Sequence, residues 1–435
     1  MTYFFETYGC QMNSAESAAL ALVCKERGWS EAAYGENADL VLLNTCSVRR
    51  TAERRVFGRI ALYASIKKKQ KRNFTLVIAG CMAQRLGDSL KEEYREIDYV
   101  MGTSARSFFP YILEAAENGK KAPAEIAEKA VFSFSQFHLE SGRFRGFVPI
   151  MHGCGNFCSY CIVPYVRGSE VSRDPRHIAR EFSLIAEHGI READLLGQNV
   201  NNYSWENMDF PALLRFCVPE AKKCGIKWLR FLSANPKNFS PETVDVMAQN
   251  EIFCRHIHLP VQHGSNIILN AMNRGYTREQ YIELVHRIMK AMPSVSLSTD
   301  ILIGFPGETE DDVKQTLDLM EEVKFLYSYM YHYNPREGTK AFNLPGRIDE
   351  NIKRERLSRV IALQKKHTVQ LLKSRIGSRE VVLVEGISRK NADELITRTE
   401  RDEMAVVKGT PSMIGSFITV NLSGLKGNTF YGLAT

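Results

Sequence analysis

The stretch Phe147-Val-Pro-Ile-Met151, followed by Gly153-Cys-Gly-Asn-Phe-Cys-Ser-Tyr-Cys161, decides how the middle of the chain folds. A short apolar run of this kind is typical of a buried strand. It leads directly into a loop with three cysteines, Cys154, Cys158 and Cys161. Reactive side chains just beyond a strand are typical of α/β enzymes, whose ligands bind at the carboxyl ends of the strands.

The strand before this loop is the first of six in the central segment. The other strand-like runs are Ala193–Leu196, Trp228–Leu232, His256–Leu259, Ser296–Ile301 and Ser328–Tyr333. Helical stretches separate them, including Pro175–His188, Pro211–Cys224, Arg278–Met292 and Glu310–Val323. Six strand–helix units predict a partial (β/α)6 version of the eight-unit barrel, with its chemistry at the strand ends.

The N-terminal segment also alternates strands and helices, which predicts a doubly wound parallel sheet. The strand-like runs are Tyr3–Thr7, Asp39–Asn44, Thr75–Ala79 and Ile97–Met101; the helical stretches are Ser14–Arg27, Thr51–Lys71 and Met82–Tyr94. Cys10, Cys46 and Cys81 each follow one of these strands. Because the carboxyl ends of parallel strands share one edge of a sheet, we expect the three thiols to converge there.

The last sixty residues have no helical period. Five short strand-like runs, separated by glycines, predict a small antiparallel β-barrel of the oligonucleotide-binding type. They are Glu380–Val384, Glu394–Thr399, Met404–Lys408, Phe417–Leu422 and Thr429–Leu433. With an aperiodic linker at 117–145, the overall class is α/β, and the predicted domains are 1–116, 146–373 and 374–435.

The ten cysteines favour metal ligation over a disulfide scaffold. The N-terminus has no basic region followed by a long apolar core, so we expect no signal peptide and a cytoplasmic protein, where disulfides are disfavoured. The longest apolar runs are too short to cross a membrane. Four cysteines lie in apolar segments and are predicted to be structural: Cys24, Cys217, Cys224 and Cys254.

The net charge of +7 is concentrated in one stretch. Residues 350–379 contain nine Lys or Arg against two Glu, a surplus of seven. Such a stretch predicts a polyanionic partner. A solvated helix face is the alternative.

The compact cysteine triplet fits an iron–sulfur cluster with one iron left open. A four-iron cluster normally takes four cysteines, so three thiolates leave one position for a small molecule. A structural zinc site would need a fourth ligand. His152 is close in sequence but lies on the strand side of the loop.

Several ordered motifs resemble the methylthiotransferases of the radical S-adenosylmethionine (SAM) superfamily. Residues Gly153 to Gly168 resemble their radical SAM box, and three stretches resemble their N-terminal cysteine boxes: Tyr8-Gly-Cys-Gln-Met-Asn13, Asn44-Thr-Cys-Ser-Val-Arg49 and Gly80-Cys-Met-Ala-Gln-Arg85. Leu196-Gly-Gln-Asn-Val200, His258-Leu-Pro-Val-Gln262 and Ile303-Gly-Phe-Pro-Gly-Glu308 also match. The C-terminal barrel resembles the RNA-binding TRAM domain.

This resemblance implies two [4Fe-4S] clusters and SAM as cofactors. Cys154, Cys158 and Cys161 would hold the cluster that cleaves SAM, and Cys10, Cys46 and Cys81 an auxiliary cluster that carries sulfur. Tyr160 matches the position that lies against the adenine of SAM. The residues expected to contact SAM at strand ends are Gly197, Gln198, Asn199, Ser233 and Gln262.

Within the superfamily, Gly9-Cys-Gln-Met-Asn13 is similar to the MiaB type. That branch converts N6-(dimethylallyl)adenosine at position 37 of tRNA to its 2-methylthio derivative. Alternatives are a threonylcarbamoyl-adenosine tRNA, an aspartate of a ribosomal protein, or a non-catalytic iron–sulfur RNA-binding protein. The implied partners are the tRNA anticodon stem-loop, an electron donor such as a flavodoxin, and an iron–sulfur or sulfur carrier protein. The protein itself is expected to be a monomer that does not bind a membrane.

Three positions depart from the family pattern. Ala193-Asp194 stands where the pattern has an apolar residue and threonine, Ala234-Asn235-Pro236 where it has Ser-His-Pro, and His263 where serine is common. An acid in a buried strand costs free energy unless it is paired, so Asp194 needs a partner.

Overall fold

The computed structural model describes residues 1–47, 50–70, 73–122, 133–134, 138–139 and 144–435. By its contacts the chain divides into two compact units. Unit 1 comprises Met1–His138, His152–Phe157 and Cys161–Val171; unit 2 comprises Leu139–Met151, Cys158–Tyr160 and Ser172–Thr435. Much of the predicted linker, 117–145, lies outside the described residues; within it are the end of helix α5 and the short strand β6 (His138–Leu139).

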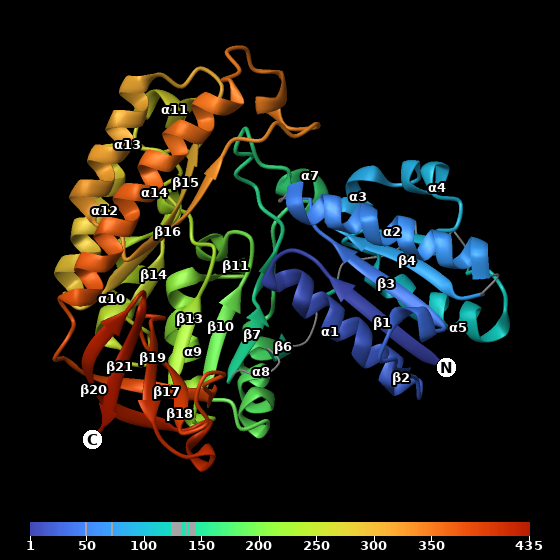
Figure 1. Cartoon of the computed structure of the whole chain (residues 1–435), viewed down its shortest axis with the longest axis horizontal. Coiled ribbons are helices and arrows are strands. Elements are labelled where there is room, and N and C mark those ends of the chain that lie inside the picture. Colours follow the sequence, from blue (N-terminus) through green and yellow to red (C-terminus); the bar gives the residue numbers. More distant parts are fainter. Residues whose placement is uncertain (48–49, 71–72, 123–132, 135–137, 140–143) are drawn as a thin grey trace. The chain divides into compact units, whose positions relative to one another are not determined.

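Unit 1 contains the predicted doubly wound sheet, with the all-parallel strand order β2-β1-β3-β4-β5 (Figure 1). Its strands are β1 (Thr2–Thr7), β2 (Ser30–Glu31), β3 (Leu40–Thr45), β4 (Thr75–Gly80) and β5 (Tyr99–Met101). Its helices are α1 (Gln11–Glu26), α2 (Arg50–Gln70), α3 (Cys81–Leu86), α4 (Ser89–Glu93), α5 (Phe109–Asn118) and α7 (Val163–Arg167). The sequence predicted α3 and α4 as a single helix.

Strand β3 shows why this sheet is covered on both faces. Val41 and Leu43 pack in one apolar core with α2, and Leu40 and Leu42 pack in another with α1 and α5. Successive side chains of a strand point to opposite faces, so a continuous apolar run requires cover on both. Because both faces are covered, side chains that contact a ligand can lie only at the ends of the strands.

Unit 2 contains six parallel strands in two groups of three. One group has the order β13-β10-β7, formed by β7 (Arg145–Pro149), β10 (Glu192–Leu196) and β13 (Trp228–Phe231), and β6 pairs with the free edge of β7 as a fourth strand. The other group has the order β14-β15-β16, formed by β14 (His256–His258), β15 (Ser296–Ile303) and β16 (Tyr327–His332). The groups meet at an isolated parallel bridge between Leu229 and Phe253. The partial (β/α)6 barrel is confirmed, but its hydrogen bonding is interrupted because β13 pairs with residues that precede β14.

Helices of unit 2 begin where the sequence provides capping side chains. They are α8 (Pro175–Glu187), α9 (Phe210–Lys223), α10 (Pro241–Gln249), α11 (Asn266–Ala271), α12 (Arg278–Ala291), α13 (Glu310–Val323) and α14 (Glu350–Lys373). Asp174, Asp209 and Ser240 each accept a hydrogen bond from an amide of the first turn, and each is followed by proline or by a residue before proline. Two short strand pairs lie in the loops. They are β8 (Met151–His152) with β9 (Val171–Ser172), and β11 (Ser204–Trp205) with β12 (Met208–Asp209).

The C-terminal strands form the predicted closed barrel, in the order β17-β18-β19-β21-β20. They are β17 (Arg379–Ile387), β18 (Glu394–Thr399), β19 (Met404–Lys408), β20 (Phe417–Lys426) and β21 (Thr429–Ala434). The sequence predicted an antiparallel barrel, and four neighbouring pairs are antiparallel, but β19 and β21 run parallel. A ring of five strands cannot alternate direction all the way round, so one parallel pair is required for closure.

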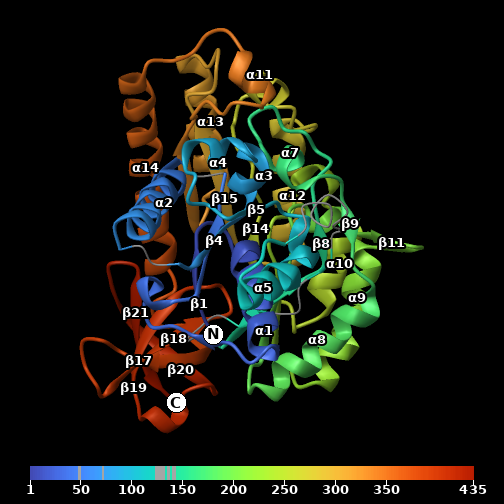
Figure 2. The ribbon, with the colours of Figure 1, turned by 90° about the vertical axis from the view of Figure 1, so that its right-hand side faces the viewer.

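The C-terminal barrel packs on the amino ends of the strands of unit 2. The rings of Trp228, the first residue of β13, and Phe417 of β20 are 4.9 Å apart and perpendicular. Arg398 of β18 forms an ion pair with Glu192, the first residue of β10. Both Figure 1 and Figure 2 show the barrel at the end of unit 2 opposite α11. The barrel therefore does not cover the carboxyl ends of these strands, where the loops with the predicted site residues lie.

Candidate active site

The three dispersed cysteines lie at the carboxyl edge of the sheet in unit 1. Cys46 and Cys81 directly follow β3 and β4, and Cys10 follows β1 within three residues. Gly9 has a φ of +124°, and a Cβ there would lie 2.7 Å from Cβ of Cys46. Only glycine permits this approach, so the loop after β1 is fitted closely against the loop after β3.

Electrostatic coupling also places these thiols together. Burial, opposed by Arg167 and reinforced by Glu16, Cys10 and Cys46, raises the pKa of the Cys81 thiol to about 12. Neighbouring thiolates repel one another in a site of low dielectric constant. Three such thiols are stable as thiolates when positive charge, such as iron, takes the place of their protons.

Two buried amides fix the loops that carry these cysteines. Nδ2 of Asn13 donates hydrogen bonds to the carbonyl oxygens of Tyr8 and Thr45, at 2.8 and 2.9 Å. Nδ2 of Asn44 donates to the carbonyl oxygen of Asn13 at 2.9 Å. Each side chain therefore joins loops that are distant in sequence, and the edge of the sheet is rigid where the thiols lie.

Arg167, whose role the sequence did not assign, is buried beside this edge. Its Nη1 donates to Oε1 of Glu16 at 2.7 Å and its Nη2 to Oδ1 of Asn13 at 2.9 Å. Although burial acts in the other direction, Glu16, Cys81 and Cys10 keep the pKa of Arg167 well above its usual range. His152 lies 3.5 Å from Nη1, and burial together with the Arg167 cation lowers its pKa to about 3. Arg167 is thus charged, and His152 is neutral.

The first part of the compact cysteine loop belongs to unit 1. The backbone amide of Cys154 donates to the carbonyl oxygen of Gly168 at 3.2 Å. Gly153 has a φ of +82°, and a Cβ there would clash with the carbonyl oxygen of Ser169. Nδ2 of Asn156 approaches Sγ of Cys154 at 3.6 Å. The residues on either side of the cysteine box therefore hold its first thiol in place.

Cys158, Ser159 and Tyr160 belong to unit 2, where Arg274 reaches them. Its Nη1 lies 3.3 Å from Sγ of Cys158 and 3.4 Å from the hydroxyl of Tyr160. The sequence did not predict this contact. The signal that could have indicated it is the position of Arg274 between Asn273 and Gly275, which both adopt left-handed backbone, with φ of 57° and 71°.

The residues predicted to contact SAM all lie at carboxyl ends of strands in unit 2. Gly197, Gln198 and Asn199 lead out of β10, and Ser233 and Gln262 follow β13 and β14. Ser233 and Gln262 have φ of +66° and +73°. Left-handed backbone outside glycine stores strain and is concentrated at functional sites, a feature that the sequence did not reveal.

The loop Gly304–Glu308 is held by buried side chains, one of them a residue that departs from the family pattern. Nε2 of His263 lies 3.1 Å from Oε2 of Glu308, which also accepts a hydrogen bond from the amide of Gly304 at 2.7 Å. Nη1 of Arg356 donates to Oε1 of Glu308 at 3.0 Å. His263 therefore has a clear structural partner in this chain.

The other two departures are also partnered. Nδ2 of Asn201 donates to the carbonyl oxygen of Asn235 at 2.7 Å, and Oδ1 of Asn201 accepts from the amide of Asn235 at 2.7 Å. Asp194 is fully buried, with Oδ2 3.5 Å from Nη1 of Arg145, and burial raises its pKa to about 6. Arg145 therefore offsets the charge of Asp194, but neither carboxylate oxygen of Asp194 accepts a hydrogen bond from the described residues.

The basic stretch 350–379 is less available to a polyanion than its charge suggests. Five of its nine cations form ion pairs within unit 2: Lys353, Arg356, Arg359, Lys366 and Arg375. The remaining four are exposed and have no ion pair among the described residues: Arg354, Lys365, Lys373 and Arg379. Much of the charge therefore secures α14 to α13 and to the loops before it.

Three of the four cysteines outside the two triplets are core residues. Cys24, Cys217 and Cys254 are buried. Burial raises the pKa of the Cys24 thiol to about 12. Cys224 is half-buried, with Sγ 3.2 Å from Oγ of Ser183. These positions agree with the structural role predicted from the sequence.

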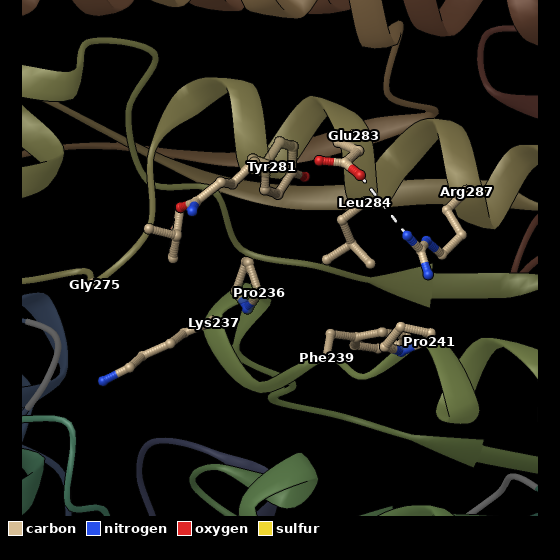
Figure 3. Close-up of a pocket in the computed structure, with 11 residues that line it drawn as sticks. Pro236, Lys237, Phe239, Pro241, Gly275, Tyr281, Glu283, Leu284 and Arg287 are labelled. Atoms are coloured by element: carbon tan, nitrogen blue, oxygen red, sulfur yellow. Dashed lines mark ion pairs between the residues drawn. The ribbon is translucent and has the colours of Figure 1, made fainter.

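A cavity of about 300 Å³ in unit 2 lies apart from the predicted contacts (Figure 3). It is lined by Pro236, Lys237, Phe239 and residues of α12, with an ion pair of 3.7 Å between Glu283 and Arg287 at its rim. None of the cysteines lines it. It adjoins the Arg274 loop through Gly275 and Tyr276.

The described residues contain neither a membrane-spanning helix nor a site for a single metal ion. No helix among them is long and apolar enough to span a membrane. No group of three or more His, Cys, Asp or Glu side chains among them is arranged to hold a single metal ion.

Comparisons with known proteins identify three regions. Residues 2–102 match the Uncharacterized protein family UPF0004, residues 148–320 the Radical SAM superfamily and residues 373–434 the TRAM domain. In fold, the chain resembles the radical S-adenosylmethionine methyltransferase TsrM of Kitasatospora setae, with a TM-score of 0.58 and 17% identity over 76% of this chain and 72% of that one.

Curated relatives cover nearly the whole chain. The chain is 48% identical over 448 residues to the tRNA-2-methylthio-N(6)-dimethylallyladenosine synthase of Treponema denticola, covering 99% of each. It is also 48% identical over 447 residues to the synthase of the same name from Treponema pallidum, covering 99% of this chain and 98% of that one. The chain therefore belongs to the family of the tRNA-2-methylthio-N(6)-dimethylallyladenosine synthases, within the radical SAM superfamily.

Proposed function

We propose that this protein converts N6-(dimethylallyl)adenosine at position 37 of tRNA to its 2-methylthio derivative, using two molecules of SAM. The named relatives carry this activity in their names. The observation that carries the proposal for this chain is the convergence of Cys10, Cys46 and Cys81 at one edge of a sheet, in addition to the compact triplet. A second set of thiols can hold the auxiliary cluster that sulfur insertion needs.

Two [4Fe-4S] clusters fit the donor sets. Cys154, Cys158 and Cys161 would hold the cluster at which SAM binds, and Cys10, Cys46 and Cys81 the auxiliary one, with a buried arginine beside each triplet. When bound, the clusters and SAM supply the radical chemistry and the sulfur. No side chain acting as acid or base can activate C2 of adenine at neutral pH, so the chain's own residues orient the reactants and exclude water.

The strand ends of unit 2 provide the side chains that would hold SAM. Gln198, Asn199, Ser233 and Gln262 are the proposed polar contacts, and Gly197 directly follows β10. Tyr160, which would lie against the adenine, packs partly on the apolar cluster that contains Phe305 and Tyr333. A ring anchored in this way can stack without further loss of conformational freedom.

Binding of the tRNA anticodon stem-loop would rely on the C-terminal barrel and on the unpaired cations of α14. Arg379, Arg389, Lys390, Lys408 and Lys426 are exposed on the barrel. Contacts with phosphates position an RNA, and unstacked loop bases provide specificity. The proposed domains are 1–116, 146–373 and 374–435, joined by the linker 117–145. An electron donor such as a flavodoxin and a sulfur carrier complete the proposed partners of a monomer.

The test combines genetics and reconstitution. Mass spectrometry of tRNA nucleosides from a strain lacking this gene should show loss of the 2-methylthio derivative and accumulation of N6-(dimethylallyl)adenosine. The anaerobically reconstituted protein, with dithionite, SAM and that tRNA, should produce 5′-deoxyadenosine and the methylthio nucleoside. Unchanged nucleosides in the strain would contradict the proposal, and absence of 5′-deoxyadenosine would favour a non-catalytic RNA-binding protein.

A further inference from the structure

Arg274 directly contacts a cysteine of the compact triplet, Cys158. Besides Sγ of Cys158 and the hydroxyl of Tyr160, it binds the carbonyl oxygen of Pro260 through Nη2 at 3.0 Å and the hydroxyl of Tyr276 through Nε at 3.0 Å. The guanidinium lies 5.4 Å from the ring centroid of Tyr276. It is buried, and every one of its nitrogen atoms has a partner.

None of these partners is a carboxylate. Across the described residues, no ion pair involves Arg274, and its partners are a thiol, two phenols and a carbonyl oxygen. A buried charge without an opposite charge is costly, and proteins normally pair it. The thiolates of the adjacent triplet are the nearest groups that can supply negative charge when a cluster is bound.

Arg167, at the other triplet, shows the contrast. It is equally buried, but Glu16 balances its charge at 2.7 Å. The pair Arg167–Glu16 brings no net charge to Cys10, Cys46 and Cys81. Arg274 brings a full positive charge to Cys158.

We infer that Arg274 is a positioning residue that makes the radical SAM cluster easier to reduce, by donating a hydrogen bond to Cys158 and by placing an uncompensated positive charge beside it. This inference rests on the proposed cluster at Cys154, Cys158 and Cys161. Reduction adds one electron, taken from a low-potential one-electron donor such as dithionite, and no proton. The cluster with its thiolates becomes more negative by one charge, and a fixed cation at hydrogen-bond distance stabilises that state. Hydrogen bonds to cluster sulfurs and local net charge are known determinants of such potentials.

The experiment uses the full-length chain with Cys10, Cys46 and Cys81 changed to alanine, so that only the compact triplet can hold iron. Arg274→Gln removes the charge, and Arg274→Lys keeps the charge but not the planar fork. Arg287→Gln is the matched control, because this exposed arginine of α12 pairs with Glu283 at 3.7 Å and touches no cysteine. Iron content is measured first, and a reductive titration followed by electron paramagnetic resonance is then carried out without SAM.

We expect all variants to retain about four irons. At a fixed potential, the ratio of reduced to oxidised cluster should fall about tenfold in Arg274→Gln, which equals a shift of about 59 mV for one electron. The ratio in Arg274→Lys should lie between those of the parent and Arg274→Gln, and the ratio in Arg287→Gln should equal that of the parent. If Arg274→Gln does not hold iron, a several-fold lower ratio in Arg274→Lys supports the inference, and an unchanged ratio overturns it.

Other outcomes separate this inference from the proposed function. A parent chain that binds no four-iron cluster contradicts the proposed function itself. An intact cluster with an unchanged ratio in Arg274→Gln overturns the inference alone. An unchanged ratio combined with weaker SAM binding also overturns it, and assigns the guanidinium to the carboxylate of SAM.

Discussion

The amino and carboxyl ends of the parallel strands in unit 2 differ in whether their buried arginines are paired with carboxylates. At the amino ends, Arg398 contacts Glu192, Glu385 and Asp402, and Arg145 and Arg230 add to the same network. At the carboxyl ends, Arg274 is buried without a carboxylate partner in the part of the chain that the structure describes, and Ser233 and Gln262 adopt left-handed backbone. At the amino ends the buried charges are balanced and hold the C-terminal barrel in place. At the carboxyl ends a buried cation has no opposite charge and the backbone is strained.

This difference follows the general division of parallel α/β barrels into a stability face and a chemistry face. A balanced network stabilises the fold but offers nothing to a ligand. An unbalanced cation and a strained backbone are costly alone and become favourable only when a ligand is bound. Substitutions at the two ends should therefore separate activity from stability.

The largest effect is expected from the cysteines. Changing Cys154, Cys158 and Cys161 to alanine should abolish formation of 5′-deoxyadenosine and leave about four irons, the content of one cluster. Changing Cys10, Cys46 and Cys81 should instead preserve 5′-deoxyadenosine and abolish the methylthio product. Iron analysis and nucleoside mass spectrometry measure both. If either triple variant lost all iron, the two sites would depend on each other.

A large loss of stability with little loss of chemistry is expected at the amino ends. Arg398→Met leaves Glu385 without its ion pair and leaves Glu192 with only Arg145 and Arg230, which should cost about 3–5 kcal/mol of unfolding free energy. Urea unfolding followed by tryptophan fluorescence measures it, since Trp228 packs on Phe417 at this interface. The double variant Glu385→Met and Arg398→Met should lose less than Arg398→Met, because Glu385 has no other ion pair among the described residues. An equal or larger loss would contradict a network held by charge.

Asp194 gives this network a pH dependence. Burial raises its pKa from 3.8 to about 6, so the folded protein keeps a proton that the unfolded chain releases near pH 4. Stability should therefore fall as the pH rises from about 4 to about 6, by about 3 kcal/mol. Asp194→Asn should remove this fall in unfolding curves recorded across that range. An unchanged slope would mean that another group titrates there.

The smallest effect is expected from relief of backbone strain at the carboxyl ends. Gln262→Gly should raise the unfolding free energy by about 1 kcal/mol and weaken SAM binding. Glu206→Gly is the matched control, because Glu206 has a φ of 51° in the exposed turn between β11 and β12. It should show the same gain without a change in SAM affinity, measured by equilibrium dialysis. If both variants bind SAM like the parent, Gln262 has no role in holding it.

Much of the fold could be predicted because local signals agree with the tertiary structure. The four strands predicted in unit 1, the six strands of the barrel and the five C-terminal strands all lie within a few residues of their predicted positions, whereas β2 was not predicted. The helix predicted at Met82–Tyr94 was wrong as a single element, and the parallel pair β19–β21 was not foreseen. Closure of a ring is a property of all five strands together, and no single strand reports it.

Placement of the buried charges could not be predicted in this way. The surplus of cations in 350–379 suggested an exposed surface, but Arg356 is buried against Glu308 and Glu310. Asn273 and Gly275 mark a turn at Arg274, but this local signal does not predict its contact with Cys158. Long side chains reach partners far away in sequence, and only the folded chain decides which partner is near.

The sequence by itself determined the two cysteine triplets, the order of strands and helices, and the family. These depend on spacing, periodicity and short motifs, which are local along the chain. The tertiary structure alone decided which charges are balanced: Arg167 by Glu16, Arg398 by Glu192, and Arg274 by no carboxylate of the described residues. Charge balance depends on distance and burial, and both are set by packing between segments more than a hundred residues apart.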